Sequence, residues 1–409
     1  MNVIFFDNWS RPHLMPLTLT RPAADLRVGI LTLREKWEQL LGTRTSSLTK
    51  PYLQEKFPLA ESNDNLLIAG NLIPSSELVR AITSLSSGEA LCNENDLLAF
   101  RTDDSSDLRN FFDHYLQVRS VALPLRQRPY DGDYQFIERP YHIFLWNGQE
   151  MERDFALLTA GRESQPLSPT NTVIGDASRI FIEEGAVVEA SLLNTREGVI
   201  YIGRHAEVME GSKLRGPVAL CDHAVTKMDA KIYGATTLGP YCKCGGELGN
   251  VMMLGYSNKA HDGFIGNAVI GEWCNLGADT NCSNLKNNYS EVRLWDYATG
   301  RMEPTGQQFC GLIMGDHSKC GINTMFNTGT VVGTFCCLFG SGFHPKHVPS
   351  FSFGEAGQPY EVHQPEKAFA TADLVMQRRH KNFNTIEQNL FQYVFNSVSL
   401  EKHQNGNCQ

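Results

Sequence analysis

Residues 202–244, IGRHAE VMEGSK LRGPVA LCDHAV TKMDAK IYGATT LGPYCK C, place an apolar or small residue at every sixth position. These positions are Ile202, Val208, Leu214, Leu220, Thr226, Ile232, Leu238 and Cys244. The same spacing returns at Met314, Cys320, Phe326, Val332 and Leu338, and IGEWCN and LGADTN begin at Ile270 and Leu276 between the two runs. An α-helix would repeat at about 3.6 residues and a simple strand at about two, so neither explains this stretch.

A period of six has a direct structural interpretation. Six residues supply one short strand and one corner, and three such units close a triangular coil of about eighteen residues. Glycine and small residues suit the crowded corners, where φ is often positive. One coil cannot bury its apolar side chains alone, so several must stack. The spacing therefore predicts a parallel β-helix, with Cys244 and Cys320 packed inward as small hydrophobic residues.

The segments on either side of the repeats have other patterns. Residues 1–165 alternate short apolar strands, such as Val3–Phe6 and Leu66–Ala69, with helical spacing at 30–41, 75–85, 105–115 and 149–160. This alternation predicts an α/β domain with a mostly parallel sheet. Residues 285–312 interrupt the period and predict a long insert between coils. Helical spacing returns after about residue 371, so we expect domains at 1–165, 166–370 and 371–409, the last ending in a disordered tail from His403.

The composition narrows the possible partners. The net charge is −9, and no basic face points to nucleic acid. No apolar stretch approaches the ~18 residues of a membrane span, and the N-terminus lacks the pattern of a signal peptide. The 11 cysteines include Cys242-x-Cys244 and Cys336-Cys337, without the paired spacing of a zinc site. We therefore expect a cytoplasmic protein with no disulfide framework and no metal site built from its cysteines. We expect neither nucleic acid nor a membrane as a partner.

The segment 246–288 carries the strongest functional signal. It contains Lys259-Ala260-His261, then Phe264-Ile265-Gly266, two repeats, the turn Gly277-Ala278-Asp279-Thr280, and Asn284-Leu285-Lys286. This order resembles the acetyltransferase domain of the bifunctional uridylyltransferase/glucosamine-1-phosphate acetyltransferase family. It is similar also to archaeal sugar-1-phosphate nucleotidylyltransferases that have the same C-terminal domain.

The resemblance implies a left-handed β-helix that assembles as a homotrimer, with acetyl-CoA bound between subunits. The attacking amine of an amino-sugar phosphate needs a base near neutral pH, and the resemblance gives that role to His261. Asn284 would hold the sugar or orient the base. Lys259, Lys286 and Arg293 are candidates to pair with the sugar's phosphate.

Three positions depart from the family pattern. Phe264 stands where the family has a tyrosine, which removes a hydroxyl from the substrate site. Gly249 aligns with a lysine of the family, and Asp279 replaces a small residue in the turn. The base remains, and these changes predict either a different amino sugar as substrate or weak acetyl transfer.

The N-terminal domain resembles nucleotidyltransferases, which implies a Rossmann-like fold. The segment His13-Leu14-Met15-Pro16-Leu17-Thr18 and the pair Arg21-Pro22 follow the family motif, so His13, Thr18, Arg21 and Asn71 are candidate nucleotide-binding residues. The glycines that let backbone N–H groups approach phosphates are absent here. Asn71 stands where the family has an aspartate for Mg²⁺, and an amide is a weaker ligand for that ion.

The preferred interpretation is therefore an acetyl-CoA-dependent N-acetyltransferase that acts on glucosamine-1-phosphate or a similar amino-sugar 1-phosphate. A sugar-1-phosphate nucleotidylyltransferase, acting with Mg²⁺ and a nucleoside triphosphate, is one alternative, and a bifunctional enzyme is a second. A non-catalytic scaffold that binds sugar phosphate or nucleotide is a third, favoured by the changes at Gly249, Phe264 and Asn71.

Overall fold

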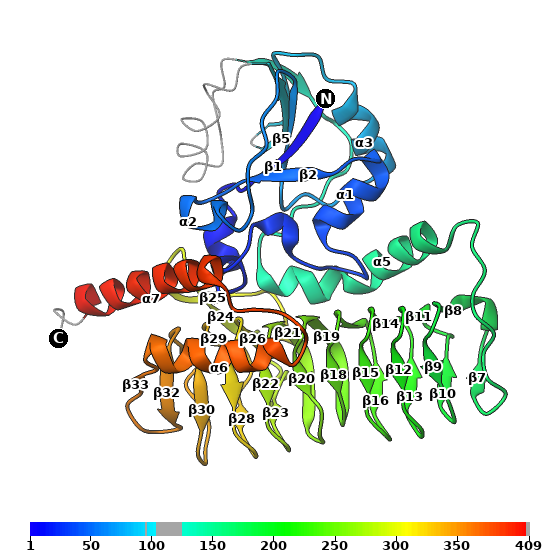
Figure 1. Cartoon of the computed structure of the whole chain (residues 1–409), viewed down its shortest axis with the longest axis vertical. Helices are drawn as coiled ribbons and strands as arrows, with labels where there is room; N and C mark the ends of the chain where they lie inside the picture. Colours follow the sequence, from blue (N-terminus) through cyan, green and yellow to red (C-terminus); the bar gives the residue numbers. More distant parts are fainter. Residues whose placement is uncertain (95, 104–124, 406–409) are drawn as a thin grey trace. The chain divides into compact units, whose positions relative to one another are not determined.

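The computed structural model describes residues 1–94, 96–103 and 125–405 of the chain (Figure 1). It divides into two compact units. The first contains residues 1–27 and 31–139, and the second contains residues 28–30 and 140–409. Each unit has its own hydrophobic core.

A mixed sheet forms the centre of the first unit. Its strands lie in the order β2-β1-β3-β5-β4-β6. They are β1 (Asn2–Phe6), β2 (Thr45–Leu48), β3 (Asn65–Ala69), β4 (Glu89–Asn93), β5 (Asp96–Thr102) and β6 (Arg126–Pro129). Both neighbours of β1 are parallel to it, whereas β5 runs antiparallel to β3 and β4. The expected α/β architecture is confirmed, but the sheet is mixed rather than mostly parallel.

The helices of this unit include those expected at 30–41 and 75–85 and several short helical segments that were not expected. They are η1 (Arg11–Leu14), η2 (Leu17–Leu19), η3 (Ala23–Asp25), α1 (Leu33–Leu41), α2 (Pro51–Gln54) and α3 (Ser76–Thr83). Helix α1 begins with a capping box, in which Thr32 and Glu35 each accept a hydrogen bond from the other's backbone N–H. It ends at Gly42, whose φ of 64° terminates the helix. The helix expected at 105–115 lies outside the described residues.

A left-handed parallel β-helix of about 10 turns, from residue 172 to 355, forms most of the second unit (Figure 1). The period of six predicted the parallel β-helix, and the family resemblance implied its left hand. Its coils have three faces. The first face contains β7 (Thr172–Ile174), β10 (Leu192–Asn194), β13 (Lys213–Arg215), β16 (Lys231–Tyr233), the first halves of β19 (Glu247–Gly255) and β21 (Phe264–Glu272), β23 (Asn281–Cys282) and β28 (Met325–Phe326). The second contains β8 (Ile180–Ile182), preceded by η4 (Ala177–Arg179), then β11 (Ile200–Ile202), β14 (Val218–Leu220), β17 (Thr236–Leu238), the second halves of β19 and β21, β26 (Leu312–Met314), β29 (Thr330–Val332) and β31 (His347–Val348).

The third face completes each coil. It contains β9 (Val187–Val188), β12 (Glu207–Val208), β15 (Val225–Thr226), β18 (Lys243–Cys244), β20 (Asn258–Lys259), β22 (Asn275–Leu276), β27 (Lys319–Cys320), β30 (Cys337–Phe339) and β32 (Ser352–Glu355). An antiparallel strand, β33 (Glu361–Val362), follows β32. The residues predicted at the sixfold positions are buried inside the coils, Cys244 and Cys320 among them.

Helix α5 (Pro140–Thr159) covers part of the second face (Figure 1). Met151 packs there against Phe181, Tyr201 and Ala219. The Asn147 amide donates hydrogen bonds to the Ala235 carbonyl at 2.6 Å and to the Thr237 hydroxyl at 3.1 Å. Residues 140–148, which are mostly apolar, and the helix expected at 149–160 thus form one continuous helix. The expected domain boundary at residue 165 accordingly differs from the division of the structure, which falls after Arg139 because α5 packs on the β-helix.

A column of stacked rings follows the corner between the second and third faces. Neighbouring ring centroids lie between 4.2 and 6.1 Å apart, and each backbone has a φ between 54° and 61°. The column, here called the aromatic ladder, consists of His205, His223, Tyr241, Tyr256, Trp273, His317, Phe335 and Phe351. Residues other than glycine seldom adopt a positive φ of this size, and the stacking of the rings offsets the cost of this backbone conformation.

The insert and the terminal helices pack on the later coils. The insert forms an antiparallel hairpin of β24 (Arg293–Asp296) and β25 (Arg301–Pro304). The terminal helices are α6 (Pro365–Gln377) and α7 (Thr385–Asn405), and Phe391 of α7 meets the ladder at Phe335, with centroids 4.8 Å apart. The helical extension begins at residue 365 rather than 371, and α7 includes residues 403–405, which we had expected to be disordered. In the described part of the chain, no helix combines the length and hydrophobicity needed to cross a bilayer.

Candidate functional site

His261 lies at the corner between the third and first faces, after β20 and before β21. Its side chain is exposed. Two residues earlier, Lys259 occupies the inward register position that Cys244 holds in the coil before it. The Lys259 ammonium donates hydrogen bonds to the backbone carbonyls of Gly245 at 3.2 Å, His261 at 2.5 Å and Asp262 at 2.8 Å. A buried cation therefore ties together the backbone that carries His261.

This position changes the interpretation of Lys259. Only 2% of the residue is exposed, and burial lowers the pKa of its ammonium. Its three hydrogen bonds are already made to carbonyls inside the coil. The expectation that Lys259 meets a substrate phosphate does not fit this geometry, because the ammonium points into the β-helix and not into solvent.

A cavity of about 470 Å³ lies beside His261, on the third face. The residues around it come from strands β18, β20, β22 and β27, from the aromatic ladder and from the end of α6. They are Lys227, Lys243, Tyr256, Asn258, Ala260, His261, Trp273, Cys274, Asn275, Lys319, Val375, Arg378 and Arg379. A volume of this size suits a small organic ligand. The cavity brings an exposed imidazole next to amides and cations, a combination that can bind an anionic substrate and accept a proton.

Sequence reasoning missed most of these residues. Lys243, Asn258, Asn275 and Lys319 occupy one outward row of the third face, because each pairs with the next across the ladder of strands. The intervals between neighbours in this row are 15, 17 and 44 residues, none of them eighteen, so the row has no regular spacing in the sequence. The run Arg378-Arg379-His380-Lys381 after α6 is the one visible signal that a basic cluster forms here.

Phe264 begins the first-face half of β21, and a residue of the same face accounts for one departure from the family pattern, the glycine at position 249. A side chain at Gly249 would meet the ring of Tyr233, because a Cβ placed there lies 2.8 Å from that ring. The Tyr233 hydroxyl donates a hydrogen bond to Glu247 at 2.6 Å. Tyr233 thus fills the space in which the family's lysine would begin.

Asn284 lies at the other end of the first face from His261. Its amide donates a hydrogen bond to the Asn267 side-chain carbonyl at 2.7 Å. Asn267 follows Phe264 by three residues, so about 10 Å of strand lies between the two corners. The structure does not bring His261 and Asn284 together within one chain.

The two cations of the insert make internal contacts. Lys286 donates a hydrogen bond to the backbone carbonyl of Glu291, and Arg293 donates two to the carbonyl of Met302, at 2.6 and 3.2 Å. The Lys286 side chain is half-buried and the Arg293 side chain is exposed. These contacts hold the insert's loop and hairpin, and neither residue lines the cavity beside His261.

The candidate nucleotide residues of the first unit are buried in its packing. Asn71 is 1% exposed and hydrogen-bonds Asn8, Ser10 and the carbonyl of Ile137. Thr18 is fully buried and donates to the carbonyl of Arg11 at 2.7 Å. Arg21 is 5% exposed, while His13 is half-buried, with its ring edge-on to Trp9 at 6.1 Å. Because the Asn71 side chain is committed to protein partners, it does not fit a ligand of Mg²⁺.

A buried ion pair occupies the place of the family's phosphate loop. Asp7 and Arg11 lie 3.1 Å apart, and both side chains are almost completely buried. Asp7 also accepts hydrogen bonds from Thr49 at 2.6 Å and from the backbone N–H of Ala23 at 2.8 Å. These groups fill the loop with internal contacts, which leaves them unavailable to nucleotide phosphates.

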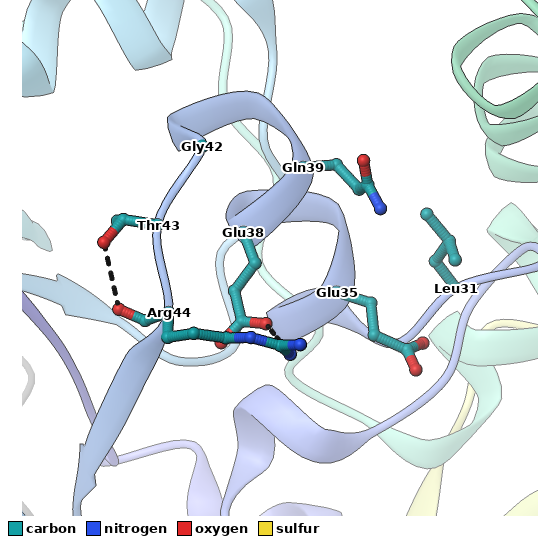
Figure 2. Close-up of a pocket in the computed structure, with 7 residues that line it drawn as sticks. All are labelled: Leu31, Glu35, Glu38, Gln39, Gly42, Thr43 and Arg44. Carbon is teal, nitrogen blue, oxygen red and sulfur yellow. Dashed lines mark hydrogen bonds and ion pairs between the residues drawn. The ribbon is translucent and has the colours of Figure 1, made fainter.

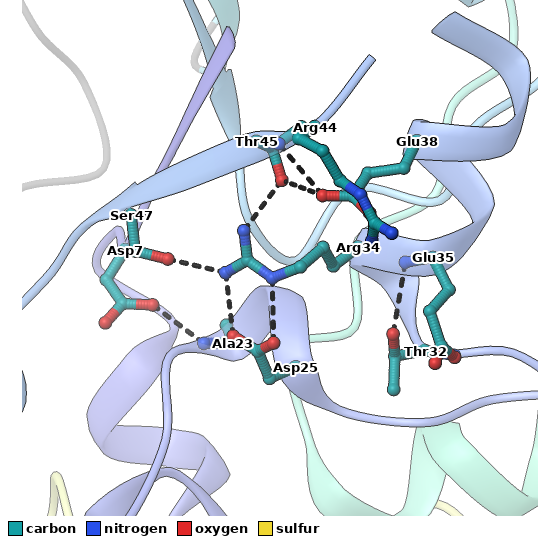
Figure 3. A network of polar contacts seen from close by, with 10 residues as sticks. All are labelled: Asp7, Ala23, Asp25, Thr32, Arg34, Glu35, Glu38, Arg44, Thr45 and Ser47. Atoms are coloured by element: carbon teal, nitrogen blue, oxygen red, sulfur yellow. Dashed lines mark hydrogen bonds and ion pairs between the residues drawn. The ribbon is translucent and has the colours of Figure 1, made fainter. Parts of the chain in front are cut away.

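Other carboxylates of the first unit are also paired. Figure 3 shows Arg34 donating to Asp25, Thr45 and Ser47, with the two bonds to Asp25 at 2.8 Å each. A hollow of about 480 Å³ lies beside α1 (Figure 2). Its acidic residues are engaged, since Glu38 pairs with Arg44 at 3.3 Å and Glu35 caps the helix. This hollow therefore offers no free pair of acid and base.

No group of three or more His, Cys, Asp or Glu side chains that could hold a metal ion occurs in residues 1–94, 96–103 and 125–405. Burial raises the pKa of the Cys244 and Cys310 thiols to about 12. Such thiols stay protonated at neutral pH and are poor metal ligands and poor nucleophiles.

The chain is similar to known transferases. Residues 3–163 match the family model described as sugar nucleotidyl transferase. The bifunctional protein GlmU of Methanocaldococcus jannaschii is 32% identical over 93 residues, which are 23% of this chain and 22% of that protein. A bifunctional sugar-1-phosphate nucleotidylyltransferase/acetyltransferase of Sulfurisphaera tokodaii is 30% identical over 90 residues, 22% of each chain. Each alignment thus spans about a fifth of the relative's length.

Among solved structures, the polySia specific acetyltransferase NeuO covers 48% of this chain and 86% of its own, at 13% identity and a TM-score of 0.22. A TM-score of this size supports no conclusion about function. The family match and the two curated relatives confirm the resemblance drawn from the motifs: the chain has an N-terminal part of the sugar nucleotidyl transferase type, and it is similar to bifunctional sugar-1-phosphate nucleotidylyltransferase/acetyltransferases.

Proposed function

We propose that the chain is an acetyl-CoA-dependent N-acetyltransferase of an amino-sugar 1-phosphate, with His261 as the general base. The observation that carries the proposal is the exposed His261 imidazole at the rim of the third-face cavity, on a corner fixed by Lys259. The similarity to bifunctional relatives with an acetyltransferase activity supports it.

The chemistry needs one proton acceptor. The amine nitrogen attacks the thioester carbonyl, and a C–N bond forms while negative charge develops on the carbonyl oxygen. His261 takes the proton that the nitrogen loses. Collapse of the tetrahedral intermediate breaks the C–S bond and releases CoA, whose thiolate is then protonated. Backbone N–H groups of the coil corner would supply the donors to the developing oxyanion.

Free-thiol release tests this proposal. Acetyl-CoA is mixed with a panel of amino-sugar 1-phosphates, with glucosamine-1-phosphate included, and His261→Gln is compared with His205→Gln. His205 is also an exposed corner histidine but does not line the cavity. Sugar-dependent release that is lost only in His261→Gln supports the proposal. Absence of release from folded wild-type protein with every sugar contradicts it.

Nucleotidylyl transfer is a second candidate, favoured by the match of residues 3–163 to the sugar nucleotidyl transferase family. The buried Asp7–Arg11 pair and the engaged Asn71 weigh against it. Pyrophosphate release from a nucleoside triphosphate, with Mg²⁺ and a sugar-1-phosphate, separates the cases. Release would establish this activity, alone or beside acetyl transfer, and its absence together with absent thiol release would favour a non-catalytic scaffold.

A further inference from the structure

Five cations gather around the cavity beside His261. Lys227 and Lys243 come from the coils before it, Lys319 from a later coil, and Arg378 and Arg379 from the turn after α6. The whole chain carries a net charge of −9. A dense group of cations is therefore unusual in this protein, and its position beside a cavity needs an explanation.

These cations are not neutralised by the protein. No carboxylate lines the cavity, and over the described ranges no ion pair joins any of the five to an acidic side chain. The Lys319 ammonium donates to the carbonyl of His317 at 3.0 Å, and Arg379 donates to the carbonyl of Arg378 at 3.3 Å. Charge on the cluster is thus left for a ligand to balance.

The cations also repel one another. Burial lowers the pKa of Lys243, and the charges of Arg379, Lys227 and Arg378 lower it further, while Glu207, two strands away, raises it slightly. Burial also lowers the pKa of Lys319. Like charges held together without a counterion cost free energy in the free protein, and a bound anion would remove that cost.

The row on the third face gives the cavity a polar floor. Lys243, Asn258, Asn275 and Lys319 follow one another in register, so about 14 Å separates the backbones of the two lysines. The Asn258 side-chain oxygen is buried without a hydrogen-bond donor among the described residues. A ligand that fits must therefore supply anionic groups to the cations and a hydroxyl or amino donor to this amide.

We propose that this cavity binds a nucleotide-type ligand with two or more phosphate groups, held by Lys227, Lys243, Arg378 and Arg379. Phosphate oxygens meet the cations, and a ribose hydroxyl or base amino group meets Asn258. CoA and a nucleoside diphosphate sugar share this chemistry. The choice of CoA rests on the proposed function, whereas the anion site itself does not.

Direct binding tests the site without any turnover. Inorganic pyrophosphate, CoA, dephospho-CoA and UDP-N-acetylglucosamine are titrated by calorimetry into the full chain, its Lys243→Gln/Arg379→Gln variant and a Lys381→Gln control. Lys381 is an exposed cation two residues beyond Arg379 and does not line the cavity. Two lost charge-assisted contacts should weaken pyrophosphate and nucleotide binding by about tenfold or more, with no change in the control.

The outcomes separate the ligand from the activity. Tighter binding of CoA than of dephospho-CoA, lost in the double variant, identifies CoA as the source, and UDP-N-acetylglucosamine binding lost in the same variant identifies a nucleotide sugar. Calorimetry needs no turnover, so binding that is lost in the double variant supports this site even if the wild-type protein releases no thiol with any sugar. Equal binding by wild type and a folded double variant, or binding of pyrophosphate with neither nucleotide, would overturn the proposal.

Discussion

At the scale of single residues, Lys259 decides how the candidate base is presented. Its ammonium holds three backbone carbonyls, two of which belong to the corner residues His261 and Asp262. The sequence motif marked Lys259 as important but gave it the wrong environment. The strict period of six ends at Cys244, and the shorter coil that follows shifts the frame, so the inward position of Lys259 could not be seen from spacing.

Replacing Lys259 with methionine should destabilise the protein and the corner together. Methionine fills the space but removes the ammonium donor from the carbonyls of Gly245, His261 and Asp262. The Asp262 carbonyl still accepts from the Asp279 N–H at 3.0 Å, so the free energy of unfolding should fall by about 1–3 kcal/mol. Lys213→Met, at an exposed lysine of the first face, should change it by less than about 0.5 kcal/mol. Denaturant titration of both variants measures this difference. Equal stability of the two would show that the internal ammonium does not hold the corner.

At the scale of elements, the hairpin β24–β25 packs on a partly buried histidine. Trp295 of β24 stacks on His347 of β31, with ring centroids 4.1 Å apart, and Tyr297 meets the same ring edge-on at 5.4 Å. The Nε2 atom of His347 is buried and has no hydrogen-bond partner in the described structure. Burial lowers the pKa of His347 to about 4.

This arrangement predicts that acid weakens the packing of the insert. As pH falls below the ordinary histidine value of about 6.5, the unfolded chain binds a proton that the folded His347 does not accept, so stability falls until about pH 4. The loss should reach up to about 3 kcal/mol. His347→Phe keeps the stacked ring and should flatten this part of the pH profile, measured by urea denaturation at pH 7.5 and 4.5. His344 and His363, whose pKa values burial also lowers, should leave a smaller slope in the variant.

The elements also show where sequence reasoning succeeds. The sixfold positions predicted the coils because each face needs one inward apolar side chain per turn, and α1 and α3 were predicted from their helical spacing. The aromatic ladder was not predicted. His205, His223 and Tyr241 lie eighteen residues apart, but Tyr256, Trp273 and His317 follow at other intervals because coils shorten and the insert intervenes. Stacking is set by the three-dimensional register, which spacing alone does not preserve.

At the scale of the whole molecule, the separation of His261 and Asn284 has a consequence for assembly. About 10 Å of strand lies between their corners within one chain, so one substrate could reach both only if two subunits meet. The resemblance implies a trimer with sites between subunits, and this expectation can be tested without a structure of the assembly.

Mixing two inactive variants should restore activity if the site is shared. His261→Gln subunits still supply Asn284, and Asn284→Ala subunits still supply His261, so co-expressed trimers contain some complete sites. Random mixing should return about a quarter of the wild-type thiol release. Failure of the co-expressed mixture to exceed the separate variants would place the whole reaction within one subunit, or remove Asn284 from it.

The proposed function requires acetyl transfer at the corner that carries His261. The most direct measurement is mass spectrometry of the sugar after incubation with acetyl-CoA and glucosamine-1-phosphate, for wild type, His261→Gln and His205→Gln. We predict a sugar phosphate heavier by one acetyl group from wild type and His205→Gln, with a loss of about 100-fold or more in His261→Gln. Undiminished acetylation by a folded His261→Gln protein would contradict the assignment of the base and of the site around it.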